Sequence, residues 1–141
     1  MKRILYLTVV FFLIVSLNKA EAQNQKVDPY LIHLIVSAGT VNDKIVLGVK
    51  SERMYPTTGY EITYSVEMRK NELYIKFGTA NAPEEGLTVF APATCYIDLG
   101  KLEHGEYKIT FEHNEKKTNG KLIVGSVLEL TIDAGSNIKP K

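Results

Sequence analysis

The residue types that most often do chemistry are sparse in this chain of 141 residues. It has one cysteine, Cys95, and three histidines, His33, His104 and His113, without a second ligand at the short spacing that a zinc site uses. Neither a Gly-x-Ser-x-Gly elbow, a His-Glu-x-x-His pair nor a phosphate-binding glycine loop occurs. The sequence therefore predicts no catalytic residue, no metal and no cofactor, and only an acid–base pair assembled from distant strands would leave a hydrolase open.

The single thiol, Cys95, lies in a segment that favours a structural role. Ala93, Cys95, Ile97 and Leu99 share one face if residues 93–99 form a strand. Free cysteine is among the most buried residue types, and one cysteine cannot form a disulfide within its own chain. We expect a buried thiol, with pairing to another chain as the alternative.

The elements that would position any site are strands. After residue 29, apolar and polar residues alternate with a period of two, and a helical period is absent. The clearest run covers residues 60–69, and similar runs follow at 72–77, 93–99 and 106–112. The residues expected to face the core are Ile62, Tyr64, Val66, Ile75, Phe77, Cys95, Ile97, Tyr107, Ile109 and Phe111.

Seven such runs without helices predict an all-β domain over residues 30–133. The expected architecture is an antiparallel two-sheet immunoglobulin-like sandwich of about seven strands. Two-residue hairpins are expected at Lys70-Asn71 and Asn119-Gly120. The last strand is expected to run over residues 122–132 with a bend at Gly125.

One tyrosine and two long connections stand out within this predicted domain. Tyr107 follows a tight turn and resembles the tyrosine corner of such sandwiches, whose hydroxyl bonds to upstream backbone. The connections at 51–59 and 79–92 are longer than compact domains usually carry, so each either has a function or contains a short strand. For the apolar residues 87–90 we expect a strand.

The first 22 residues have the features of a secretory signal peptide. Lys2 and Arg3 precede an apolar run of 14 residues, and Ala20-Glu21-Ala22 has the small-x-small pattern of a cleavage site. The run is shorter than the roughly 20 residues that a membrane-spanning helix needs. We expect cleavage after Ala22 and a secreted protein, periplasmic or extracellular, with an uncleaved N-terminal anchor as the alternative.

Charge limits the classes of partner. Cleavage after Ala22 leaves 119 residues with 14 Lys+Arg and 15 Asp+Glu, a formal charge of −1. This balance argues against nucleic acid and anionic membranes as partners, since both select for clustered positive charge. After cleavage we expect no membrane span, and the polar segments 23–29 and 134–141 are expected to be flexible ends.

The sharpest motif is Pro56-Thr57-Thr58-Gly59-Tyr60, preceded by Tyr55. It resembles the first inhibitory loop of chagasin-like inhibitors of papain-family cysteine peptidases, which reads Asn-Pro-Thr-Thr-Gly-Tyr or Phe. The resemblance implies an immunoglobulin-like sandwich whose loops at one end enter the peptidase cleft. Here Tyr55 replaces the Asn, and the family's Gly-x-Gly-Gly and Arg-Pro-Trp loops have no counterpart, so the motif is also compatible with an ordinary turn.

A wider resemblance covers more of the chain. Tyr55-Pro56, Pro92-Ala93-Thr94 and the segment 98–107 resemble pieces of small secreted immunoglobulin-like proteins of Bacteroidetes type, most of them uncharacterised. This resemblance implies a fold and a compartment. We expect a non-enzymatic binding module that acts through end loops on a protein, peptide or glycan, with a cysteine peptidase inhibitor acting through residues 55–60 as the alternative.

Overall fold

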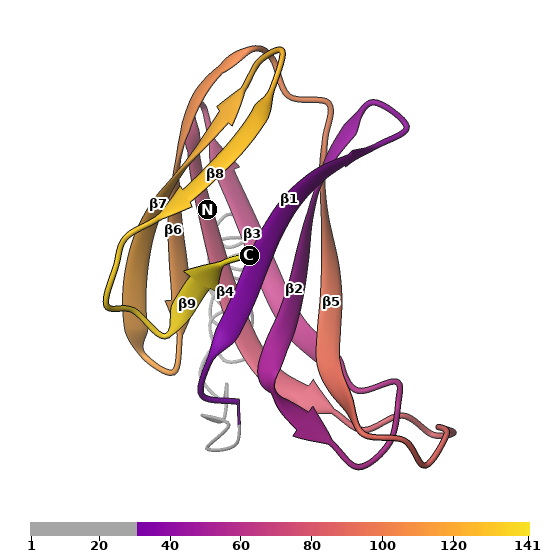
Figure 1. Cartoon of the computed structure of the whole chain (residues 1–141). Helices are drawn as coiled ribbons and strands as arrows, with labels where there is room; N and C mark the ends of the chain where they lie inside the picture. The colour runs from indigo at the N-terminus through magenta and orange to yellow at the C-terminus, as the bar shows by residue number, and fades with distance from the viewer. Residues whose placement is uncertain (1–30) are drawn as a thin grey trace, which may run out of the picture.

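The computed structural model describes residues 31–141, and its nine strands form one sheet (Figure 1). The strands are β1 (Leu34–Val41), β2 (Lys44–Tyr55), β3 (Glu61–Arg69), β4 (Glu72–Asn81), β5 (Ala91–Gly100), β6 (Gly105–His113), β7 (Lys116–Val124), β8 (Leu128–Ile132) and β9 (Ile138–Pro140). Their order across the sheet is β8-β7-β6-β4-β3-β5-β2-β1-β9. The edge strands β8 and β9 contact each other, so the sheet curls into a nearly closed, barrel-like shape.

The all-β prediction is confirmed, whereas the two-sheet sandwich of about seven strands is wrong. The expected strand 122–132 is two strands, because β7 reverses through residues 125–127 and β8 runs back antiparallel to it. The segment 134–141, expected to be a flexible tail, contains β9, which pairs parallel to β1. Its Ile138 is buried, and burial of this apolar side chain favours an ordered strand.

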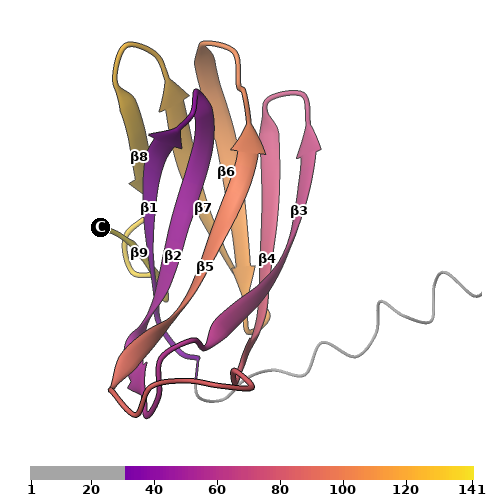
Figure 2. The ribbon, with the colours of Figure 1, turned by 90° about the vertical axis from the view of Figure 1, so that its right-hand side faces the viewer.

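One backbone contact joins the two halves of the sheet. β3 and β5 pair only at Glu61↔Thr94, where the Thr94 amide donates to the Tyr60 carbonyl oxygen at 3.0 Å. Beyond that pair the strands diverge, and β3 carries no partner on this edge within the described residues (Figure 2). Between β3 and β5 the sheet is therefore continuous only at the first residue of β3, and the two strands are not paired along the rest of their length.

The core lies between the two halves, as the alternating pattern predicts. Its members come from every strand except β8 and include eight of the ten residues expected to face inward: Ile62, Ile75, Phe77, Cys95, Ile97, Tyr107, Ile109 and Phe111. Tyr64 and Val66 were expected to be buried and are exposed. The prediction is wrong for these two, which follow the point where β3 leaves β5, so among the described residues no strand pairs with β3 on that edge beside them.

The hairpins are partly as predicted. The turn at Lys70-Asn71 is confirmed, with the positive φ of 53° at Lys70. The turn expected at Asn119-Gly120 instead lies at Asn114 and Glu115, whose φ angles are 50° and 63°. Gly120 belongs to β7, where a Cβ would lie 2.6 Å from the Thr131 carbonyl oxygen of β8. That glycine serves close strand packing rather than a turn.

Two further local expectations have clear outcomes. The Tyr107 hydroxyl donates to the Glu103 carbonyl oxygen at 3.0 Å, which confirms the tyrosine-corner contact. Residues 88 and 89 form a bend and residues 87–90 contain no strand, so the strand expected there is wrong. His113 is fully buried at the end of β6, and its Nε2 hydrogen-bonds the Leu31 carbonyl oxygen. This histidine therefore has a structural role, holding the start of the described chain against the core.

The two-loop tip as a candidate binding site

The predicted interaction loop, Tyr55 to Tyr60, connects β2 to β3 at one end of the molecule (Figure 1). Its members differ in exposure. Pro56 and Gly59 are exposed, and Thr57 and Thr58 are half-buried. Tyr55 is buried, so it belongs to the base of the loop rather than to its surface.

The base of this loop is closed by side chains. The rings of Tyr55 and Tyr60 stack with their centroids 4.4 Å apart. On β2, the buried Ser51 hydroxyl donates to the Arg53 carbonyl oxygen at 2.7 Å and accepts from the Ala93 amide at 2.9 Å. These bonds stabilise the irregular step between β2 and β5. The loop therefore leaves the sheet from a fixed position.

A second loop, residues 82–90, is bound to the first. The Thr58 amide donates to the Leu87 carbonyl oxygen at 3.0 Å, and the Leu87 amide donates to Thr58 Oγ1 at 3.1 Å. Gly86 permits this approach, because a Cβ at that position would lie 2.5 Å from the Thr58 carbonyl oxygen. We call residues 56–60 and 82–90 together the two-loop tip.

Gly59 has two reasons to be glycine. Its φ of 90° is in the left-handed region that side-chain-bearing residues rarely adopt. A Cβ there would also lie 3.1 Å from Pro83 Cβ of the second loop. The glycine of the motif thus serves the joint between the two loops, in addition to any role at a surface.

The tip carries large apolar side chains in solvent. Leu87 is 72% exposed, Val89 57% and Phe90 71%. Met54, at the end of β2, is also exposed. Clustered exposed apolar residues on an ordered loop mark interaction sites in water-soluble domains. In the sequence, the apolar character of residues 87–90 favoured a strand. An apolar run inside a long connection is also a signal for a binding loop.

The turn between β6 and β7 lies at the same end as the tip. β4 and β6 are parallel neighbours, so their carboxyl ends point the same way. β4 leads into residues 82–90, and β6 leads into Asn114 and Glu115. The two-loop tip and the turn at Asn114 and Glu115 therefore lie at one end of the molecule.

Within residues 31–141, no three His, Cys, Asp or Glu side chains lie close enough to hold a metal ion. Burial raises the pKa of the Cys95 thiol from its ordinary value of 9.0 to about 12, which disfavours the nucleophilic thiolate. His104 lies on the connection between β5 and β6, at the other end of β6 from the tip. His33 precedes β1.

No membrane-spanning helix is present in the part of the chain that the structure describes. The signal peptide expected at 1–22 and the segment 23–29 lie outside the described residues.

Comparison with known proteins returns no relative: neither a protein family, a curated protein nor a solved structure matches this chain.

Proposed function

We propose that the protein is a secreted, non-enzymatic binding module that holds a protein partner with the two-loop tip. The observation that supports this most is the exposure of Leu87, Val89 and Phe90 on loops joined by hydrogen bonds. A few large apolar side chains usually supply most of the free energy of a protein interface. Loops that are already ordered lose less conformational entropy on binding.

The charges of the tip indicate the kind of partner. Glu84 and Glu85 lie in the same loop as the apolar side chains and are exposed. An interface of this type fits an apolar cleft with a basic rim, because complementary charge at the rim speeds association and excludes wrong partners. We therefore propose a protein partner with such a cleft.

Photocrosslinking tests the proposal in the native setting. Phe90 would be replaced by a photoreactive phenylalanine analogue in protein exported by its native host, with Tyr96 replaced in a matched control. Tyr96 is as exposed as Phe90 but lies on β5, outside the tip. We expect a specific crosslinked protein from position 90 and none from position 96.

The purified crosslinked protein then serves as the ligand in a binding measurement. Phe90→Ala should weaken the affinity at least about tenfold, as truncation of an interface anchor does. Tyr96→Ala should leave the affinity unchanged. Equal crosslinking from both positions, or an affinity that Phe90→Ala does not alter, would contradict the proposal.

Secretion is part of the proposal and has its own test. The charged start, the short apolar run and Ala20-Glu21-Ala22 support removal of residues 1–22. N-terminal sequencing of the exported protein should begin at Gln23. Recovery of a chain that still contains residues 1–22 would overturn this part.

Inhibition of a papain-like cysteine peptidase is a second candidate function. It is favoured by the place of residues 56–60 at the same end as the β6–β7 turn, with Gly59 exposed. Since two of the family's three loop sequences are missing, we expect inhibition no stronger than micromolar, about −8 kcal/mol. Gly59→Glu should abolish it with the fold intact, which thermal unfolding of the variant would check. Full peptidase activity at high micromolar concentrations of the protein would remove this candidate.

A further inference from the structure

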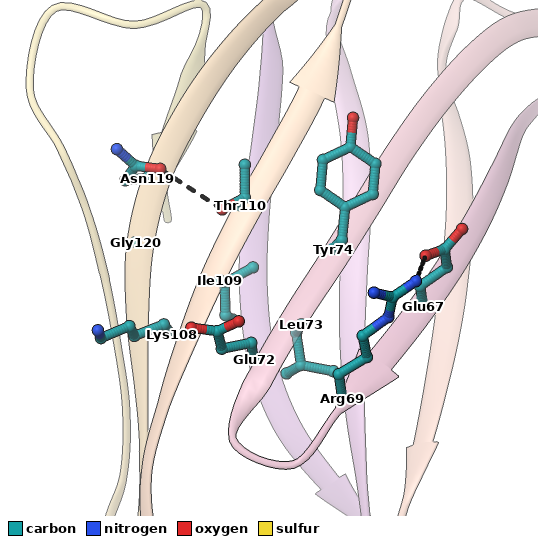
Figure 3. Close-up of a pocket in the computed structure, with 10 residues that line it drawn as sticks. All are labelled: Glu67, Arg69, Glu72, Leu73, Tyr74, Lys108, Ile109, Thr110, Asn119 and Gly120. Atoms are coloured by element: carbon teal, nitrogen blue, oxygen red, sulfur yellow. Dashed lines mark hydrogen bonds and ion pairs between the residues drawn. The ribbon is translucent and has the colours of Figure 1, made fainter.

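A groove of about 640 Å³ crosses the outer face of β3, β4, β6 and β7 (Figure 3). It is lined by Glu67, Arg69, Glu72, Leu73, Tyr74, Lys108, Ile109, Thr110, Asn119 and Gly120. The groove reaches the β3–β4 turn, whereas the two-loop tip follows the other end of β4. It is therefore a site separate from the tip.

Strand register sets the floor of this groove. Glu67 pairs with Tyr74, Tyr74 with Thr110, and Thr110 with Asn119, so these four residues form one row across four strands. Residues in register on neighbouring strands point to the same face. Thr110 is the shortest of the four side chains and lies beside the Tyr74 ring, which Figure 3 shows face on.

Longer side chains form a wall on one side of that row. There Glu72 pairs in register with Arg69 on β3 and with Lys108 on β6, and all three line the groove. On the other side of the row, outside the lining, Lys76 Nζ and Glu112 Oε1 form an ion pair of 3.3 Å. Because all these residues stand on paired strands, the groove is built on rigid elements, as a specific binding site requires.

A second cavity of about 630 Å³ extends the groove around the β3–β4 turn. It shares Arg69, Glu72 and Lys108 with the first cavity and adds Lys70, Asn71 and Glu106. Because the two cavities adjoin, together they have room for a longer ligand than either cavity holds alone. Each cavity has the volume typical of a small-molecule site.

The charges of the residues that line the two cavities balance. Three carboxylates and three cations line the two cavities: Glu67, Glu72, Glu106, Arg69, Lys70 and Lys108. A nucleic acid or other polyanion would meet three carboxylates, and a polycation would meet three positive groups. The groove crosses the outer face of β3, β4, β6 and β7, whereas a peptide strand that joins a sheet lies along a strand edge, so such a peptide would not fill the groove.

With polyanions, polycations and an added peptide strand disfavoured, a neutral ligand fits the groove best. A neutral ligand needs both donors and acceptors, which the carboxylates, cations, Thr110 and Asn119 provide. Tyr74 provides an aromatic face, whose electron-rich π system attracts positively polarised hydrogens. Lys117 Nζ lies 5.6 Å from the centre of that ring, on a long exposed side chain that a ligand can displace. We propose that this groove binds a neutral oligosaccharide chain that packs on Tyr74.

The test is affinity electrophoresis of the exported protein in gels containing neutral polysaccharides, each a separate probe: xylan, glucomannan, starch and a mixed-linkage β-glucan. At least one should slow the protein relative to a gel without polysaccharide. Titration with oligosaccharides of that polymer should then give a dissociation constant. Binding should tighten with chain length, because the groove and its extension together accommodate several sugar units.

Variants separate the groove from the rest of the surface. Tyr74→Ala should weaken binding about fivefold to tenfold, the loss expected for one aromatic contact. Thr110→Arg, which fills the floor from the outer face without touching the core, should abolish binding. Tyr96→Ala, which removes an exposed tyrosine of β5, should leave binding unchanged, as should Phe90→Ala in the two-loop tip.

Thermal unfolding of each variant confirms that it folds. Absence of retardation by every neutral polysaccharide would overturn the proposal, as would retardation that Thr110→Arg leaves intact in a folded variant.

Discussion

Strands β3 and β4 form one hairpin with the same alternating pattern, yet solvent reaches them very differently. On β4 the inward residues Leu73, Ile75 and Phe77 are at most 3% exposed. On β3 their register partners Met68, Val66 and Tyr64 are 51%, 37% and 41% exposed. Partner residues on one face of one hairpin thus have opposite environments.

The cause lies in the neighbours of each strand. β4 is paired on both edges, by β3 and by β6, and the other half of the sheet faces it across the core. β3 has β4 on one edge and meets β5 on the other only at Glu61↔Thr94 (Figure 2). Alternation in the sequence specifies a strand and its two faces, whereas burial of a face depends on residues far away in the chain.

The largest loss of unfolding free energy should come from a substitution on β6, the strand beside β4. Phe111 on β6 is fully buried, and its ring packs with that of Phe77 at a centroid separation of 6.1 Å. Phe111→Ala should lower the free energy of unfolding by about 3–5 kcal/mol, as large core truncations do. Denaturant unfolding measures it. A loss below about 1 kcal/mol would mean that this half of the core is loosely packed.

A single register pair sharpens the comparison most directly. Ile75 of β4 and Val66 of β3 lie opposite each other, one fully buried and one exposed. Ile75→Ala should cost about 2–5 kcal/mol of unfolding free energy. Val66→Ala should cost less than about 1 kcal/mol, since little apolar surface is uncovered. Equal costs at the two positions would show that β3 is covered in solution.

The thiol of Cys95 tests the covered side of the β3–β5 junction. Because the thiol is buried in the folded chain, a bulky thiol reagent should react with it far more slowly in buffer than in urea. Equal rates would show that the register of β5 is wrong.

The same thiol gives a pH dependence with a defined sign. Its folded pKa of about 12 lies above its ordinary value of 9.0, so the unfolded chain loses this proton first as pH rises. The free energy of unfolding should therefore fall between pH 9 and pH 12. Cys95→Ala should remove that part of the slope, which unfolding curves at several pH values would measure. An unchanged slope in the variant would contradict the raised pKa.

The smallest expected effect concerns the gap itself. The Tyr64 hydroxyl donates to the Tyr96 carbonyl oxygen at 3.0 Å, so one side chain spans the opening between β3 and β5. Tyr64→Phe should lower the free energy of unfolding by no more than about 1 kcal/mol, because the bond is exposed. Faster amide hydrogen exchange in β5 alone should accompany it. A loss of several kcal/mol would mean that the hydrogen bond between Tyr64 and Tyr96 contributes much more to stability than an exposed bond should.

Much of the fold followed from pattern alone. Alternation placed Ile75, Ile109 and most of the expected core correctly, and the tight turn before Tyr107 predicted its hydroxyl contact. Turn chemistry was less reliable. Asn119-Gly120 has the composition of a hairpin turn, but close packing of Gly120 on β8 explains the glycine, and the turn formed at Asn114 and Glu115.

The candidate site was only partly predictable, for a physical reason. The motif at 56–60 identified one loop of the tip, but its partner, residues 82–90, lies more than 20 residues further along the chain. Their contact depends on Gly86, and the sequence alone does not show which segment a loop glycine lies against in the folded chain. The groove depends on strand order, since Tyr74 and Asn119 share a row only because β4, β6 and β7 are neighbours.

The parallel pairing of β1 with β9 has a consequence for how the chain folds during synthesis. Leu34 is among the first described residues, and its amide donates to the Asn137 carbonyl oxygen at 2.9 Å. During synthesis from the N-terminus, the outer edge of β1 therefore stays without its partner strand until almost the whole domain has been made. An edge open for that long favours pairing with other chains. Removal of residues 138–140 should therefore be poorly tolerated. It should also increase the dependence of folding on chaperones, because the edge of β1 then has no partner strand.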